Sequence, residues 1–190
     1  MRLLPVLTPV LLTLIGSSCT KPEQPAPERP QPTRLELVER GRYLVEIMSC
    51  NDCHTPKIMG PHGPMNDPDR ILSGHPADAP VPPVNDEVLK DWVLFSMNGT
   101  TMVGPWGTSF SGNLTSDATG TGNWTEEQFK RAITHGLYKG LEGSRPLLPP
   151  MPWENYKNIK DEDVHAIFTY LRSTKPVENV VPAPIPPTRH

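Results

Sequence analysis

Apolar residues recur at the three- and four-residue steps of an amphipathic helix in three segments of the chain. The first segment covers residues 35–49, and the last covers residues 161–173, where three acidic residues occupy the first turn and complement the helix dipole. The middle segment begins with a capping-box sequence at Thr125 and ends at Gly136, a residue type typical of helix C-termini. We therefore expect three main helices, and Gly41 within the first apolar stripe predicts a close approach between the first helix and the last.

Two other segments lack a single periodicity. Apolar positions in residues 86–98 fit a helix, but residues 93–103 equally fit a hairpin that turns at Asn98 and Gly99, so both structures stay open. Residues 59–83 are rich in proline and predict an irregular loop, longer than the roughly 12 to 15 residues usual for a loop without function. With 25 prolines and 14 glycines, the chain is expected to form a mainly α fold of short helices and long Pro/Gly-rich loops.

The N-terminal residues have the pattern of an export signal. Residues 1–18 carry one basic residue, a short apolar stretch and then small residues. The stretch is shorter than the about 20 residues of a membrane-spanning helix. The small residues before Cys19 resemble a bacterial lipoprotein signal, in which that cysteine is lipidated, and cleavage by an ordinary signal peptidase is the alternative. We then expect a Pro-rich tether at 19–33, one domain at 34–175 and a Pro-rich C-terminal tail at 176–190.

The composition sets bounds on function. A chain of 190 residues is long enough for one domain, so a multidomain enzyme with its own cofactor domain is unexpected. The formal net charge is −3, and the chain therefore lacks the basic excess with which proteins bind nucleic acid. Apolar residues make up 36 % of the chain and aromatic residues 6 %, which predicts a thin core that a bound group would help to fill.

Two of the three cysteines belong to a short chemical motif. The odd number of cysteines argues against a disulfide framework. Cys50, Cys53 and His54 form the C-x-x-C-H pattern of c-type haem attachment, in which two thiols reach the porphyrin vinyl groups and the histidine binds the iron. A thioredoxin-like pair would need a flanking β-α-β pattern, and a structural zinc site would need about four ligands. The sequence offers neither, and it predicts one covalently bound haem c.

Most of the chain between residues 35 and 173 resembles the class I c-type cytochromes, and more narrowly the cytochrome c domains of bacterial alcohol-dehydrogenase-type complexes. Besides the haem motif, the resemblance rests on residues 41–44, 112–117, 120–125, 150–152 and 161–164. It implies the cytochrome c fold, in which the first and last helices pack together. It also implies redox partner proteins, either a dehydrogenase or an oxidase.

Met151 is the candidate for the second axial ligand of the iron. It lies in a proline-rich segment directly before the last helix, where the resembled family has its distal methionine. Met97 and Met102, which flank the possible turn at residues 98–99, are alternatives. Histidines elsewhere in the chain are further alternatives, namely His62, His75, His135 and His165. A methionine ligand closes the iron to substrates, favours the ferrous state and makes electron transfer the expected role.

The sequence thus predicts a monohaem c-type cytochrome that transfers single electrons between exported or membrane-bound redox partners and has no catalytic residue of its own. One alternative is a fixed haem electron-acceptor subunit of a membrane-bound dehydrogenase or oxidase complex. Another is a haem enzyme or gas sensor with an open sixth position on the iron. In each case we expect a periplasmic protein, or one on the outer side of a bacterial membrane, anchored by lipid at Cys19.

Overall fold

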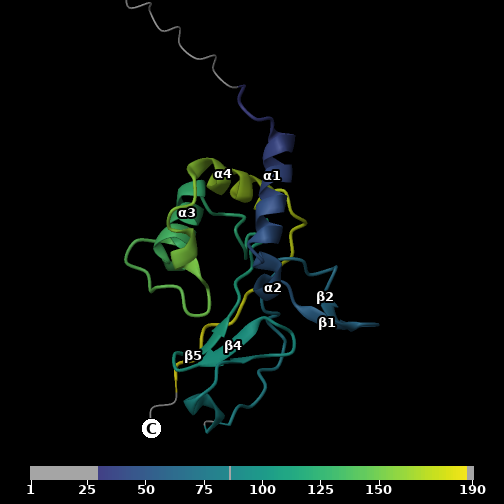
Figure 1. Ribbon diagram of the computed structural model, residues 1–190, viewed down its shortest axis with the longest axis vertical. Helices are drawn as coiled ribbons and strands as arrows, with labels where there is room; N and C mark the ends of the chain where they lie inside the picture. Colours follow the sequence, from purple (N-terminus) through teal and green to yellow (C-terminus); the bar gives the residue numbers. More distant parts are fainter. Residues whose placement is uncertain (1–29, 86, 188–190) are drawn as a thin grey trace, which may run out of the picture. The chain divides into compact units, whose positions relative to one another are not determined.

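The structure of the chain is a computed structural model that describes residues 30–85 and 87–187 (Figure 1). Contacts divide the chain into two units, residues 1–31 and residues 32–190, and every described helix and strand belongs to the second unit. The predicted signal peptide and Cys19 lie outside the described residues, as does most of the predicted tether. No helix in the described part of the chain has the length and apolar character needed to cross a membrane.

Short helices and short strands alternate along the second unit. The α-helices are α1 (Arg34–Ile47), α2 (Cys50–His54), α3 (Glu126–His135) and α4 (Asp161–Leu171). The strands are β1 (Lys57–Gly60), β2 (Gly63–Asn66), β3 (Leu94–Phe95), β4 (Thr101–Gly104) and β5 (Gly107–Phe110). The 3₁₀ helices are η1 (Val88–Lys90), η2 (Tyr138–Gly140) and η3 (Trp153–Tyr156). The strands form an antiparallel β1–β2 hairpin and an antiparallel sheet in the order β3–β4–β5, and most of this β-structure was not predicted from the sequence.

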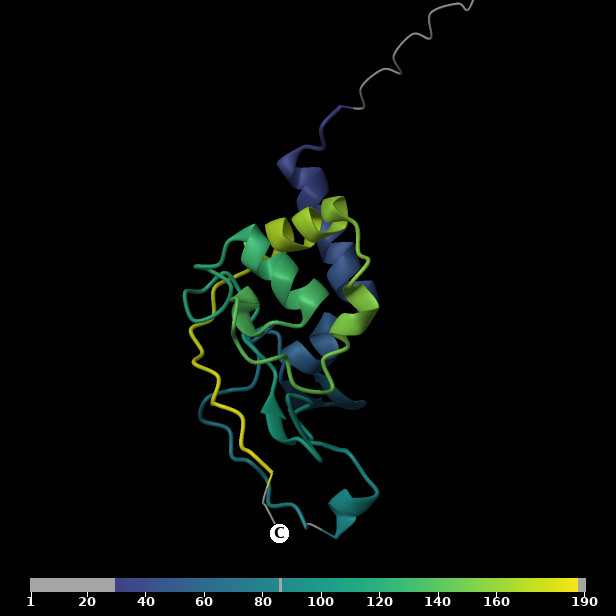
Figure 2. The same ribbon diagram turned by 90° about the vertical axis from the view of Figure 1, so that its left-hand side faces the viewer.

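The first and last helices pack against each other at Gly41, as the sequence predicts (Figures 1 and 2). A Cβ atom on this glycine would overlap the carbonyl group of Ala166 and would lie 2.7 Å from Cβ of Tyr170. Apolar side chains from α1, α3 and α4, with one from the loop after β2, form the core at this contact. Its buried members are Leu44, Val45, Leu72, Phe129, Ile133, Val164, Ala166, Ile167 and Leu171.

Local capping explains where α1 and α3 begin and end. Capping boxes at Thr33 and Thr125 satisfy the first backbone N–H groups of α1 and α3. Gly136, in the left-handed conformation with φ 65°, ends α3 as predicted. The first helix is shorter than its predicted range, because Ser49 adopts φ 56° and breaks the helix before α2 begins.

Two hairpins resolve the segments that periodicity could not assign. Leu94 pairs with Val103 across the turn at residues 98–99, so residues 93–103 form the hairpin, and η1 is the only helical turn described in 86–98. Residues 57–66 also form a hairpin, so the prediction of an irregular loop was wrong for its first part. Gly60 pairs with Gly63 there, and the positive φ of 121° at Gly63 lets the chain reverse despite the neighbouring prolines.

The segment after α4 runs back along β5 (Figure 2). The backbone N–H of Thr108 donates to the carbonyl of Ile185 at 2.8 Å, and the N–H of Ile185 donates to the carbonyl of Thr108 at 3.0 Å. Residues 176–187 are therefore called the C-terminal strap. It pairs with the edge strand β5 at this one position.

Candidate functional site

Helix α2 presents two free thiols three positions apart. Cys50 and Cys53 are both half-buried, and Cys50 packs against the apolar core. Burial raises the pKa of Cys50 to about 11 and also raises the pKa of Cys53. Both groups are therefore protonated thiols at neutral pH, unlike the low-pKa thiolate of a catalytic redox pair. This environment and the hairpin that follows α2 do not fit a thioredoxin-like site.

The imidazole of His54 is oriented by a backbone carbonyl. Its Nδ1 lies 2.7 Å from the carbonyl oxygen of Gly112. Because a carbonyl only accepts, Nδ1 carries the proton and Nε2 keeps the lone pair with which histidine binds a metal. Burial lowers the pKa of His54, which favours the neutral ring needed for such a bond.

The backbone around His54 is held by a glycine that comes from a distant loop. The N–H of Gly74 donates to the carbonyl of His54 at 2.7 Å. Gly74 has φ 76°, and a Cβ atom there would lie 2.5 Å from the carbonyl carbon of Gly112. Only glycine lets the two backbones approach this closely, so Gly74 allows the carbonyl of Gly112 to reach the imidazole.

The end of α2 is fixed by a buried hydroxyl. Thr55 donates its hydroxyl to Oδ1 of Asn51 at 2.8 Å and accepts the N–H of Leu72 at 2.8 Å. This contact anchors the loop that carries Gly74 directly to α2. The two thiols and the imidazole thus belong to one short helix with a defined orientation.

Met151 lies in a segment that contacts the same part of the fold. Its side chain is half-buried, and its carbonyl accepts the N–H of Trp153 at the start of η3. The hydroxyl of Ser109 donates to the carbonyl of Pro149 at 2.8 Å. Ser109 and Gly112 are three residues apart, a span of at most about 10 Å, so one short segment contacts both the Met151 loop and His54.

A second contact joins the segment after Met151 to the C-terminal end of α1, two residues before α2 begins. The Tyr156 hydroxyl in η3 donates to the carbonyl of Met48 at 3.4 Å. Burial, together with the nearby Cys50 and Cys53, raises the pKa of Tyr156. Tyr156 therefore lies in the neighbourhood of the thiols, and Met151 precedes it by five residues in the same segment.

The alternative ligands lie in other surroundings. Met97 is 77 % exposed on the β3–β4 turn, whereas Met102 is buried in β4. His75 is buried, with Nδ1 at 2.9 Å from the hydroxyls of Thr100 and Thr101. His62, His135 and His165 are exposed. Within residues 30–85 and 87–187, no three His, Cys, Asp or Glu side chains are grouped so as to hold a metal ion.

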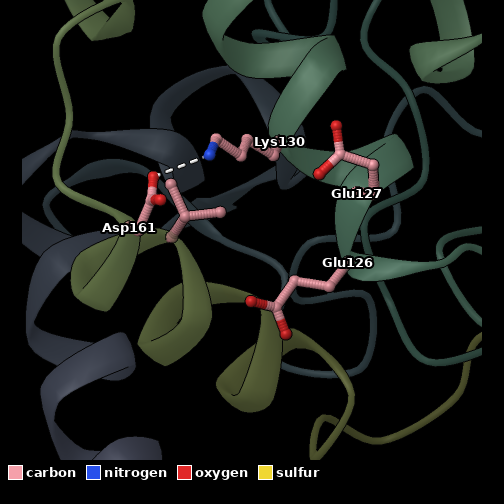
Figure 3. Close-up of a pocket in the computed structure, with 5 residues that line it drawn as sticks. Glu126, Glu127, Lys130 and Asp161 are labelled. Atoms are coloured by element: carbon pink, nitrogen blue, oxygen red, sulfur yellow. Dashed lines mark ion pairs between the residues drawn. The ribbon is translucent and has the colours of Figure 1, made fainter.

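A surface cavity of about 330 Å³ lies between α3 and α4 (Figure 3). Its lining is Glu126, Glu127, Lys130, Asp161 and Val164. An ion pair of 2.8 Å joins Lys130 to Asp161. The hydrogen bond that Lys130 donates to the Asp161 carboxylate raises the pKa of Lys130. The lining contains no thiol, imidazole or thioether, so this cavity is separate from the candidate site.

Gly74, Gly112 and Thr55 were not predicted as site residues from the sequence. Gly112 belonged to a recognised motif but had no assigned role, and its contact with His54 spans 58 positions. The available signal was the small residue Gly74 in an otherwise bulky, proline-rich segment. Such a glycine indicates that another backbone segment approaches closely, but the sequence does not show which segment it is.

Comparisons with known proteins give the relatives of the chain. No family model matches this sequence. The chain is 30 % identical over 148 residues to a subunit of nicotinate dehydrogenase from Pseudomonas putida, covering 77 % of this chain and 9 % of the relative. It is 29 % identical over 168 residues to the fructose dehydrogenase cytochrome subunit of Gluconobacter japonicus, covering 87 % of this chain and 26 % of the relative. It is 37 % identical over 143 residues to the cytochrome c subunit of the quinone alcohol dehydrogenase of Gluconacetobacter polyoxogenes, covering 74 % of this chain and 23 % of the relative.

The chain is similar to cytochrome c subunits of dehydrogenases. The matched region spans about a tenth to about a quarter of the length of these relatives. The resemblance drawn from the sequence motifs is confirmed to this extent. The similarity therefore concerns one part of each relative.

Proposed function

We propose that the chain is a cytochrome c unit that carries one covalent haem c and serves as a fixed electron-acceptor subunit of a membrane-bound dehydrogenase complex. The observation that carries this proposal is the arrangement on α2, where two neutral thiols stand beside an imidazole whose Nδ1 is held by Gly112. This donor set fits the group, because Nε2 of His54 is left free as a ligand. The haem, when bound, supplies one-electron transfer between ferric and ferrous iron.

Each site residue has a separate role in this proposal. Cys50 and Cys53 would attach the porphyrin by thioether bonds, and His54 would bind the iron. Met151 would supply a second ligand to the iron and favour its ferrous state, as a soft thioether does. The helices and loops are proposed to form the cytochrome c fold, for which the contact between α1 and α4 at Gly41 is the supporting observation.

The relatives favour a fixed subunit over the freely diffusing carrier expected from the sequence. Their names describe a cytochrome subunit of fructose dehydrogenase and a cytochrome c subunit of alcohol dehydrogenase. We therefore propose a dehydrogenase as the electron donor and an exported location, with lipid at Cys19 holding the chain at the membrane. In this role the chain carries electrons and performs no substrate chemistry of its own.

Mass and absorption spectra of the matured protein test the cofactor assignment. We expect one porphyrin per chain, lost from the double variant Cys50→Ala, Cys53→Ala. Met151→Ala should open the iron, so that carbon monoxide binds the reduced variant quickly while the parent and the exposed control Met97→Ala bind it slowly. A parent without a porphyrin adduct would refute the proposal, and a Met151→Ala spectrum identical to that of the parent would refute that ligand.

Purification from native membranes tests the fixed-subunit assignment. We expect a large dehydrogenase subunit to remain with the chain through size exclusion at high salt, and Cys19→Ser to reduce retention in the membrane fraction. Elution of the haem-loaded chain alone would favour the diffusing carrier instead.

A further inference from the structure

The C-terminal strap contributes a buried amide close to the loop that holds His54. Asn179 is 7 % exposed, and its Nδ2 donates to two carbonyls on either side of Gly74, those of Ser73 at 2.7 Å and His75 at 2.9 Å. Its Oδ1 accepts the N–H of Ala77 at 3.0 Å. One side chain therefore fixes the backbone of the whole turn that contains Gly74.

Asn179 is itself held in place by the rest of the strap. Its N–H donates to the hydroxyl of Thr119 at 2.9 Å. Nδ2 of Asn113 donates to the carbonyl of Val177 at 2.9 Å, two residues earlier in the strap. The amide of Asn179 therefore ties the Gly74 turn to a strap that is held by contacts of its own.

The Gly74 turn transmits this position to His54 through two contacts. The N–H of Gly74 bonds the His54 carbonyl, and the N–H of His75 bonds the carbonyl of Ser111 at 2.9 Å. Ser111 precedes Gly112, whose carbonyl accepts Nδ1–H of the imidazole. A shift of the turn would therefore move both the backbone of His54 and the acceptor of its ring.

We infer that Asn179 is a positioning residue for His54, which sets the ring orientation and the strength of the Nδ1–H bond to Gly112 from the far end of the chain. This inference rests on the proposed function, because its consequence falls on the iron ligand. A strong bond at Nδ1 makes Nε2 more basic, and a more basic ligand favours ferric iron. Loss of the hydrogen bonds that Asn179 makes to the Gly74 turn should therefore raise the reduction potential of the haem iron.

The test compares Asn179→Asp with the parent in the haem-loaded protein. The aspartate keeps the shape and the acceptor for Ala77 but replaces the two donated bonds with repulsion between oxygens. We expect the equilibrium constant for reduction to rise by up to about tenfold, which corresponds to about 59 mV for one electron. We also expect a lower iron–histidine stretching frequency, measured for each variant in the reduced Met151→Ala background, in which the iron would be open on one side. Val180→Ala, which alters a 69 % exposed neighbour, is the matched control and should leave both quantities unchanged.

The milder variant Asn179→Ala covers the case in which the aspartate disturbs folding, and it should shift both quantities in the same direction. An unchanged potential and stretching frequency in a variant that is only less stable would overturn the inference. So would failure of both variants to mature while Val180→Ala matures, since Asn179 would then serve folding alone. A parent that carries no porphyrin would refute the proposed function itself, a result distinct from either of these.

Discussion

Two regions of the molecule are ordered by different forces. They are the apolar region, formed by helices α1, α3 and α4, and the polar region around β4, β5 and the strap. Helices α1, α3 and α4 bury apolar side chains such as Val45, Phe129 and Ile167 and carry their charges outward. Buried polar side chains concentrate in the other region, namely Ser73, His75, Thr100, Thr101, Thr108, Ser109, Ser111, Asn113, Thr115, Thr121 and Asn179. Residues 92–116 contain no Asp, Glu, Lys or Arg. Nondirectional apolar burial thus orders the first region, and directional hydrogen bonds order the second.

This difference matters for the candidate site because α2 lies where the two regions meet. Cys50 packs on the apolar core, whereas His54 is held by backbone groups of the polar region. Apolar packing tolerates small changes of angle, while a hydrogen bond weakens steeply when its angle departs from linearity. In the proposed function, the attachment of the haem would therefore depend on the apolar region and the orientation of His54 on the polar region.

The largest expected loss of stability comes from disrupting the contact between α1 and α4 at Gly41 in the apolar region. Gly41→Ala places a Cβ against the carbonyl of Ala166, and a helix backbone cannot rotate away as a side chain can. Although alanine is favoured by about 1 kcal/mol in a helix interior, we expect a net loss of about 3 kcal/mol in the free energy of unfolding. Urea unfolding of the matured protein measures it, with the exposed variant Glu39→Ala as a control that changes stability by less than about 0.5 kcal/mol. A loss no greater than that of the control would mean that the helices separate without penalty.

A smaller loss of stability is expected from removing the hydrogen bonds that Asn113 makes in the polar region. Its Nδ2 bonds the strap carbonyl of Val177, and its Oδ1 accepts the N–H and hydroxyl of Thr115. Asn113→Ala leaves buried partners unsatisfied, which costs about 2 kcal/mol, and should speed amide hydrogen exchange in the strap. The exposed Asn123→Ala serves as the matched control. Equal stability of the two variants would show that solvent replaces these bonds and that the strap is not held by them.

The two regions also differ in how far the sequence predicts them. The three main helices follow from periodicity and from caps such as Thr125, signals contained within about a dozen neighbouring residues. The attachment motif on α2 is equally local. The polar network joins Asn179 to Ser73 across 106 positions, and the small polar residues that form it have no periodic pattern. Prolines beside β2 hid the first hairpin for a related reason, because its turn depends on the conformation of Gly63.

The smallest expected effect concerns protonation within the polar region. Burial lowers the pKa of His75 from its usual value near 6.5, against smaller opposing effects of the Ala79 backbone and the charge of Asp78. The side chains that β4 and its preceding turn place against the ring are the uncharged Thr100 and Thr101. The folded chain then binds fewer protons than the unfolded chain between the lowered pKa and about pH 6.5. The free energy of unfolding should fall as the pH drops through that interval, by at most about 1.4 kcal/mol per pH unit, and His75 adds no slope above it.

Unfolding of the parent and of His75→Gln at matched pH values between about pH 7 and pH 5 isolates this contribution, because glutamine does not titrate. The variant is less stable throughout, so the slope against pH carries the information and the absolute stability does not. His62→Gln, which alters an exposed histidine on the first hairpin, is the matched control for a histidine-to-glutamine change. If His75→Gln kept the slope of the parent, His75 would titrate alike in the folded and unfolded chains. The polar region would then be hydrated like a surface, and the contrast with the apolar region would reduce to side-chain type alone.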